Sequence, residues 1–149
     1  MTIVSNKNTP RNTYTASANQ TSFAIGFEFY QIADVKVYKN GTLLTYNATP
    51  SGSSQYSITG TASASDNAYE FGAGGSITLG AGASANDIIV IIRDISVERT
   101  TDFPNSGAFD ITSLNTQLDT LTSIVADVKT QTDRSVKLLD TDTVSATVT

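Results

Sequence analysis

Two residue types that support most enzyme and metal chemistry are missing, since the chain contains no cysteine and no histidine. Without cysteine, neither a disulfide framework nor a thiolate metal site can form. Without histidine, the usual general base and the commonest metal ligand are absent. Catalysis would have to rest on carboxylates, lysine or tyrosine, and no grouping of these suggests a reaction. The sequence therefore predicts no enzyme, no cofactor and no metal site.

Basic residues and long apolar runs are also scarce. Lys and Arg total 9 against 14 Asp and Glu, which gives a formal net charge of -5. The basic face that nucleic acids require is therefore not expected. No apolar run approaches the ~20 residues that span a bilayer, and the first residues lack the apolar core of a signal peptide. We expect a soluble protein that binds neither nucleic acid nor membrane and is made where no secretion signal is needed.

Two short motifs resemble chemical sites only superficially. Gly72–Gly75 is glycine-rich like a phosphate loop, but it leads into a predicted strand and offers no helix N-terminus to an anion. Asp94, Glu98 and Asp102 could supply a carboxylate pair or a cation site. Surface charges, or partners for the nearby arginines, explain these three residues more simply.

The pattern of a β domain begins near residue 14. Apolar residues alternate with others in two successive segments: Phe23, Ile25, Phe27 and Phe29, and then Val35 and Val37. A period of two predicts strands that turn one face toward a core. The pair Asn40–Gly41 between strand-like residues predicts a tight hairpin, because both central turn positions favour positive φ.

Three further strands are expected at residues 56–59, 76–79 and 88–97, with a Gly-, Ala- and Ser-rich insertion at 60–75. The glycines at 80–82 are expected to end the second of these strands. The third is apolar on both faces, which predicts cover on both sides, and a second subunit could supply part of it. Arg93 in this strand would need a carboxylate or carbonyl partner that the sequence does not identify.

The last regular segment, residues 111–139, shows a heptad repeat. Apolar side chains recur there in alternating steps of three and four: Ile111, Leu114, Leu118, Leu121, Val125 and Val128. This pattern predicts a helix that buries a narrow seam against copies of itself, and Asp110 is a suitable N-cap. At 1.5 Å per residue the helix would form a rod of roughly 40 Å.

The sequence leaves two questions about this helix open. A single amphipathic helix packed back on the β domain would show the same apolar spacing. If the helices associate, the Ile, Val and Leu positions lean toward two strands, whereas Ile124 widens the apolar stripe and favours three. Dimer and trimer therefore remain undecided at this point.

The expected fold class is mainly β with a carboxyl-terminal coiled coil. A small sandwich-like domain of short antiparallel strands occupies residues 14–98, after a flexible arm at 1–13. A linker at 99–110 leads to the helix at 111–139, and residues 140–149 form a tail or begin a further element.

Several short segments occur in a characteristic order. They are Phe23-x-Ile25-x-Phe27-Glu28-Phe29, Val35-x-Val37-Tyr38-x-Asn40-Gly41, Tyr56-Ser57-Ile58, Ile77-Thr78-Leu79, a hydrophobic strand ending in Arg93, Arg99-Thr100-x-Asp102-Phe103, Gly107-x-Phe109 and Leu114-Asn115-x-x-Leu118-Asp119. This ordered set resembles the N-terminal, virion-anchoring domain of tail fibre proteins from short-tailed phages (podoviruses). The resemblance covers roughly residues 14–135, and the insertion at 60–75 departs from it.

The resemblance implies a homotrimer, with the heptad seam joining three helices along a fibre axis. It implies that the β domains dock to tail adaptor or nozzle proteins and that a distal fibre or receptor-binding subunit follows. The protein would then be a structural part of the virion, assembled in the host cytoplasm. The docking surface would include the following residues: Tyr38, Lys39, Asn40, Gly41, Tyr69 and Phe71.

The alternative function is a carbohydrate-binding β module of a phage or cell-surface adhesin. It rests on four aromatic residues in or near loops, which could form a stacking surface for sugars: Tyr38, Tyr46, Tyr69 and Phe71.

Overall fold

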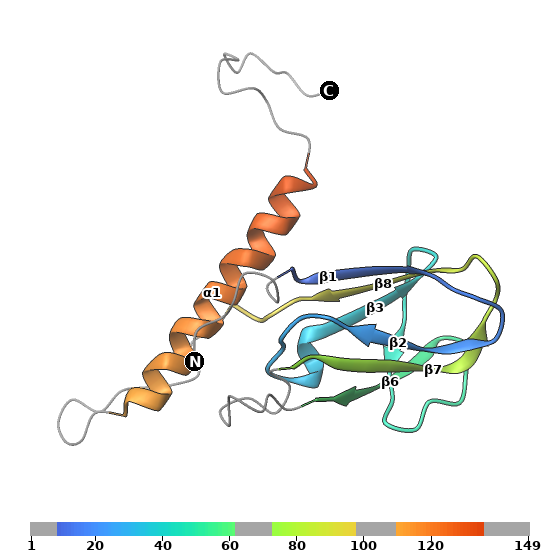
Figure 1. Cartoon of the computed structure of the whole chain (residues 1–149), viewed down its shortest axis with the longest axis horizontal. Helices are drawn as coiled ribbons and strands as arrows, with labels where there is room; N and C mark the ends of the chain where they lie inside the picture. The colour runs from blue at the N-terminus through green and yellow to red at the C-terminus, as the bar shows by residue number, and fades with distance from the viewer. Residues whose placement is uncertain (1–8, 62–72, 98–109, 136–149) are drawn as a thin grey trace, which may run out of the picture.

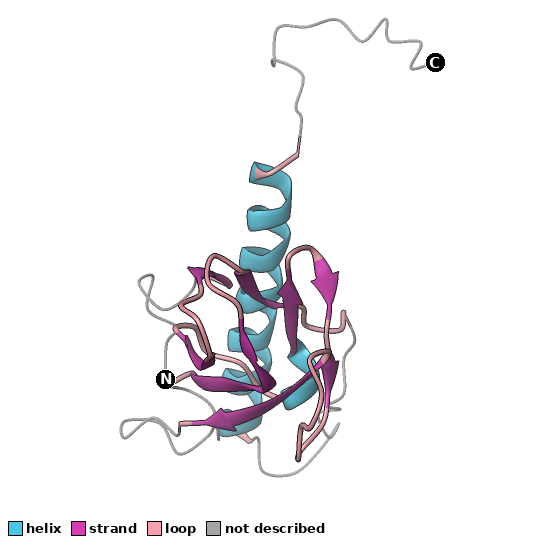
Figure 2. Ribbon diagram, turned by 90° about the vertical axis from the view of Figure 1, so that its right-hand side faces the viewer, coloured by secondary structure: helices cyan, strands magenta, loops and turns pink. Residues whose placement is uncertain are grey.

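The computed structural model describes residues 9–61, 73–97 and 110–135. Within these ranges, two four-stranded sheets form a sandwich, and one long helix follows them (Figure 1). The predicted sandwich-like β domain with a carboxyl-terminal helix is therefore confirmed. The helix crosses one end of the sandwich and extends past it, as the turned view in Figure 2 also shows.

Sheet A has the strand order β1-β8-β3-β4, and sheet B has the order β2-β7-β6-β5. The strands are β1 (Arg11–Thr15), β2 (Gln20–Ile25), β3 (Val35–Lys39), β4 (Thr42–Leu43), β5 (Thr45–Tyr46), β6 (Gln55–Gly60), β7 (Gly75–Ala83) and β8 (Ile88–Arg93). A short 3-10 helix, η2 (Ile32–Asp34), precedes β3, and α1 covers Ile111–Asp133. The strand pairs are antiparallel except β5 with β6, which is parallel.

The core lies between the two sheets, and the apolar residues that alternate along the sequence point into it, as predicted. The apolar side chains of β2 and of the segment after it are buried, with exposed fractions of 2% or less: Phe23, Ile25, Phe27 and Phe29. β2 itself ends at Ile25, so the last two keep the alternation without belonging to a strand. The Tyr56 hydroxyl of sheet B donates to the Val35 carbonyl of sheet A at 2.8 Å, which ties the layers together.

The predicted hairpin is confirmed. β3 pairs with β4, and the turn between them places Asn40 at φ 50° and Gly41 at φ 83°. Both residues adopt the left-handed conformation that an Asn-Gly turn favours.

The predicted end of β7 is wrong. The strand runs through the glycines to Ala83 instead of stopping at Leu79. A Cβ on Gly80 would lie 2.6 Å from the Gly52 carbonyl oxygen, and one on Gly82 would lie 2.9 Å from Asn19 Cα. These glycines therefore allow close backbone approach within a continuing strand.

Two other strand boundaries also differ from the prediction. β8 ends at Arg93, not Val97, and Val97 is 82% exposed. β1 begins at Arg11, inside the segment predicted as an arm, because its residues pair with β8 from Arg11↔Ile92 onward. The core face of β8 is buried, whereas Ile88 on its outer face is 40% exposed, so one chain does not cover both faces fully.

The start of α1 is as predicted. The Asp110 side chain accepts a hydrogen bond from the Thr112 backbone N–H at 3.0 Å, which caps the first turn. The predicted end near residue 139 is wrong, because the helix ends at Asp133, with Arg134 as its C-cap. The last residues of the predicted helix, the linker at 99–109, most of the 60–75 insertion and the segment at 140–149 lie outside the described residues.

Candidate functional site

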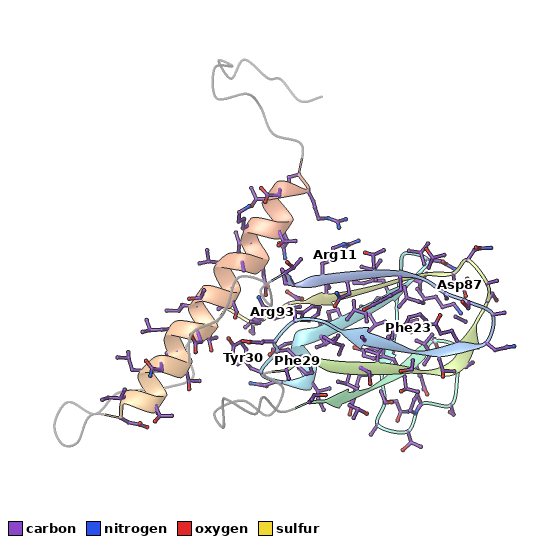
Figure 3. All side chains as sticks on the ribbon, in the orientation of Figure 1. Arg11, Phe23, Phe29, Tyr30, Asp87 and Arg93 are labelled. Carbon is purple, nitrogen blue, oxygen red and sulfur yellow. The ribbon has the colours of Figure 1, made fainter. Side chains whose placement is uncertain are left out.

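A buried arginine links the helix to the sandwich. The Arg93 side chain, at the end of β8, is fully buried, and its Nε donates to Asp127 Oδ1 on α1 at 3.0 Å. Nη1 donates to the Glu28 carbonyl at 2.9 Å, and Nη2 donates to the Ser123 carbonyl at 3.2 Å. The guanidinium therefore links β8, the segment after β2 and α1. It lies at the end of the sandwich next to the helix (Figure 3).

A second polar contact lies beside the first. The Tyr30 hydroxyl and Ser123 Oγ are 2.8 Å apart, and Ser123 is fully buried. Burial raises the pKa of Tyr30 to about 12, although its hydrogen bond to Ser123 acts in the opposite direction. The Asp34 carboxylate accepts the backbone N–H groups of Tyr30 and Gln31 at 3.2 and 2.9 Å, which fixes the conformation of the segment that carries Tyr30.

Burial also raises the pKa of Asp127, and the neighbouring Arg93 opposes that shift. Asp127 Oδ2 is buried and has no hydrogen-bond partner among the described residues. Taking both charges out of water offsets much of their attraction, so such a pair contributes more to orientation than to stability. We infer that the Arg93–Asp127 pair fixes which face of α1 packs on the sandwich.

That face of the helix is polar. The buried residues of α1 are Asp119, Ser123 and Asp127, spaced four apart and hence on one side. A helix that packed on a domain through the heptad stripe would bury its apolar side instead. The alternative of a helix packed back on the β domain is therefore met in part: α1 contacts the sandwich, but through its polar face and not through its apolar stripe.

The heptad stripe points away from the sandwich. Leu114 is half-buried. The other five residues of the stripe are more than half exposed: Ile111 65%, Leu118 51%, Leu121 57%, Val125 66% and Val128 53%. At 100° per residue, the stripe is centred about 170° from the buried polar face. Figure 3 shows side chains projecting from the side of α1 that faces away from the sheets. Among the described residues, five of the six predicted interface side chains thus form an exposed stripe.

The predicted docking residues have different environments. Lys39 Nζ lies 2.9 Å from Asp87 Oδ2, and Asn40 Nδ2 donates to Asp87 Oδ1 at 2.8 Å. Asn40 Oδ1 also accepts the Ile88 backbone N–H at 2.8 Å. Hydrogen bonds from Asn40 and Lys39 lower the pKa of Asp87 to about 2. Lys39 and Asn40 therefore stabilise the hairpin at the end of the sandwich far from the helix (Figure 3).

The other predicted docking residues divide into two groups. Tyr38 and Gly41 line a groove of about 430 Å³ between the outer face of sheet A and the last turns of α1. Tyr69 and Phe71 lie outside the described residues. The groove itself was not apparent from the sequence, because it combines β1, β8 and α1, which are far apart in the chain.

The aromatic residues proposed to stack on sugars do not share one surface in the described structure. Tyr38 belongs to sheet A, whereas Tyr46 belongs to sheet B, where its ring centroid lies 6.0 Å from that of Tyr56. No observation therefore favours the carbohydrate-binding alternative.

The parts of the chain that the structure covers contain no cluster of three or more acidic side chains placed to hold a metal ion. Asp94 is exposed, and its proposed neighbours Glu98 and Asp102 are outside those parts. No helix within the same ranges has the length and apolar character needed to cross a membrane.

No protein-family model matches the chain, and no curated protein sequence matches it.

Proposed function

We propose that this protein is the structural base of a homotrimeric fibre. Its helices associate through the heptad stripe, and its sandwiches anchor the assembly to a larger particle. The supporting observation is that the apolar stripe of α1 is exposed directly opposite the polar face that packs on the sandwich. Packing three such stripes together hides the apolar side chains and leaves each sandwich on the outside of the bundle.

The energetics favour a moderate association. Full burial of an aliphatic side chain contributes about 1.5–3 kcal/mol, so five that are roughly half exposed would contribute about 4–8 kcal/mol per chain. Loss of translational and rotational freedom costs about 4–15 kcal/mol. At the favourable ends of these ranges, three chains gain about 24 kcal/mol against about 8 kcal/mol for two associations. The net of about 16 kcal/mol corresponds to oligomers that form at micromolar concentration and dissociate on dilution. A strict seven-residue repeat also imposes a left-handed supercoil.

The segment order that resembles podovirus tail fibre bases favours three copies over two and a virion location. In that setting the sandwiches dock to tail adaptor or nozzle proteins. The helical bundle then leads toward a distal fibre or receptor-binding subunit. The function is mechanical attachment, which needs no cofactor and agrees with the absence of cysteine and histidine from the sequence.

Multi-angle light scattering on the purified chain tests the association. A trimer has three times the chain mass of 15.7 kDa. The double substitution Leu121→Gln with Val125→Gln should yield monomers whose far-ultraviolet spectrum keeps the sandwich signal. Asn115→Gln, an exposed helix position off the stripe, is the matched control and should leave the mass unchanged. A wild-type monomer at tens of micromolar would refute the proposal.

A further inference from the structure

The groove beside α1 has an apolar floor. Val90 and Ile92 project from the outer face of β8, and Tyr38 projects beside them from β3, where it is opposite Val90. The floor continues beyond the groove to exposed apolar residues, Ile88 at 40% and Leu43 at 53%. Leu43 is the strand partner of Tyr38. An uncovered apolar strip of this kind on a sheet is typical of a surface that binds another molecule.

Two arginines supply the charge of the groove. Arg11 comes from β1, where it is opposite Ile92, and Arg134 follows the last turn of α1. Neither guanidinium forms an ion pair or a side-chain hydrogen bond in the described structure. Burial and the nearby Arg134 charge lower the pKa of Arg11. The one carboxylate that lines the groove, Asp127, is paired with Arg93. The groove therefore holds two like charges close together, at Arg11 and Arg134, which favours binding of an anion.

Polar groups that can bind a peptide backbone also line the groove. Thr130 and Gln131 contribute from the helix. The hydroxyl of Thr130 and the side-chain amide of Gln131 can each bond to a peptide main chain. The groove thus offers sites for an apolar side chain, for a carboxylate and for the main chain between them.

Association of the helices leaves the groove open. The helix residues that line it (Asp127, Thr130, Gln131 and Arg134) belong to the sandwich-facing side of α1, not to the heptad stripe. The occupant is therefore expected to come from outside the helical bundle. Nucleic acid is disfavoured because the chain carries a net charge of -5 and the groove floor is apolar.

We propose that this groove binds a short extended segment of a partner protein in which an apolar residue adjoins an acidic one. The apolar side chain packs on Val90 and Ile92, and the carboxylate pairs with Arg11 and Arg134. Guanidinium groups suit this role because their planar donor geometry matches a carboxylate. The inference rests on the proposed function, since it gives the anchoring sandwich a docking site and a partner chemistry.

Peptide titrations into the ¹⁵N-labelled full chain, followed by NMR, test this site. The probe is acetyl-Leu-Asp-Leu-Asp-amide, and acetyl-Leu-Asn-Leu-Asn-amide is its uncharged counterpart. We expect saturable shifts at the backbone amides of β8 and of Thr130–Arg134, with a Kd of about 1 mM. Binding should weaken at least tenfold for the Asn peptide and for the variant R11Q/R134Q. Lys129→Gln removes a charge from an exposed residue outside the groove and should leave binding unchanged.

Equal binding of both peptides, or no shifts at the groove amides, would overturn the proposal. The proposal would also be overturned if the substitutions R11Q/R134Q dissociated the oligomer, because a second copy of the chain would then be the occupant of the groove. The light-scattering mass separates this test from that of the fibre base. Loss of peptide binding with an intact trimer refutes only the groove, and peptide binding by a monomer refutes only the trimer.

Discussion

Arg93 decides how the two parts of the molecule meet. Burying a guanidinium costs free energy unless its donors form hydrogen bonds. The Arg93 donors bond to Glu28, in the segment that follows β2, and to two residues of α1. An apolar residue at this position could pack on many surfaces, whereas the arginine accepts few geometries. The pair thus selects the polar face of α1 for contact with the sandwich and leaves the apolar stripe free.

Asp127→Ala should destabilise the protein strongly. It leaves the buried Arg93 without its carboxylate, which typically costs 3–5 kcal/mol; we expect about 3 kcal/mol because two carbonyl acceptors remain. Asp133→Ala on the same helix is the control, since its ion pair with Lys129 is exposed and such pairs contribute about 0.5 kcal/mol or less. Urea denaturation measures both. Equal costs for the two substitutions would show that the buried pair has no special role.

Asp87 should make stability depend on acid. Its pKa is about 2 in the folded chain, against an ordinary value of 3.8, so the unfolded chain binds more protons between these pH values. The stability that Asp87 contributes is therefore complete above pH 4 and is lost as the pH falls toward 2. Denaturation midpoints of wild type and Asp87→Asn should differ at pH 5 and converge at pH 2. A constant difference would contradict this assignment.

At the scale of single elements, short-range patterns predicted the fold well. The alternation from Phe23 to Phe29 identified the core face, Asn40–Gly41 identified the hairpin, and Asp110 identified the helix start. Each of these features depends on residues close together in sequence. The continuation of β7 through Gly80 was missed because the cause is the backbone of Gly52, which lies in a distant loop.

The sequence of the helix also contains a pattern that indicates which of its faces packs on the sandwich. Asp119, Ser123 and Asp127 recur at a spacing of four on the side opposite the heptad stripe. Together with one arginine in an otherwise apolar strand, that spacing indicates a polar docking face. The specific partner of Arg93 could not be predicted, because it lies 34 residues away along the chain. The groove could not be predicted for the same reason.

Gly80→Ala tests the close backbone contact in sheet B. A Cβ there meets backbone atoms of the Gly52 loop at 2.6 Å, which cannot move as a flexible side chain would. We expect a loss of about 1–3 kcal/mol, seen as a lower melting temperature. Gly52→Ala, where a new Cβ meets nothing within 4 Å, should change stability by about 0.5 kcal/mol or less. The opposite ranking would refute the contact.

At the scale of the whole molecule, the two faces of α1 have different roles. The polar face binds the chain's own sandwich, and the exposed apolar face is available to sister copies. In the proposed trimer, the sandwiches would surround a helical bundle and the groove on sheet A would remain open to a partner. Assembly and docking would then use separate surfaces of one small chain.

The central claim is that sister copies bury the heptad stripe against one another in parallel. The chain has no cysteine, so a single engineered thiol reports on this contact. Disulfides require Cα atoms within about 7 Å, so Val125→Cys should cross-link rapidly on oxidation. In a trimer, about one chain in three stays unlinked. Asn115→Cys, exposed but off the stripe, should remain monomeric on a denaturing gel. Absence of cross-linking at Val125, or equal cross-linking at both positions, would contradict the account.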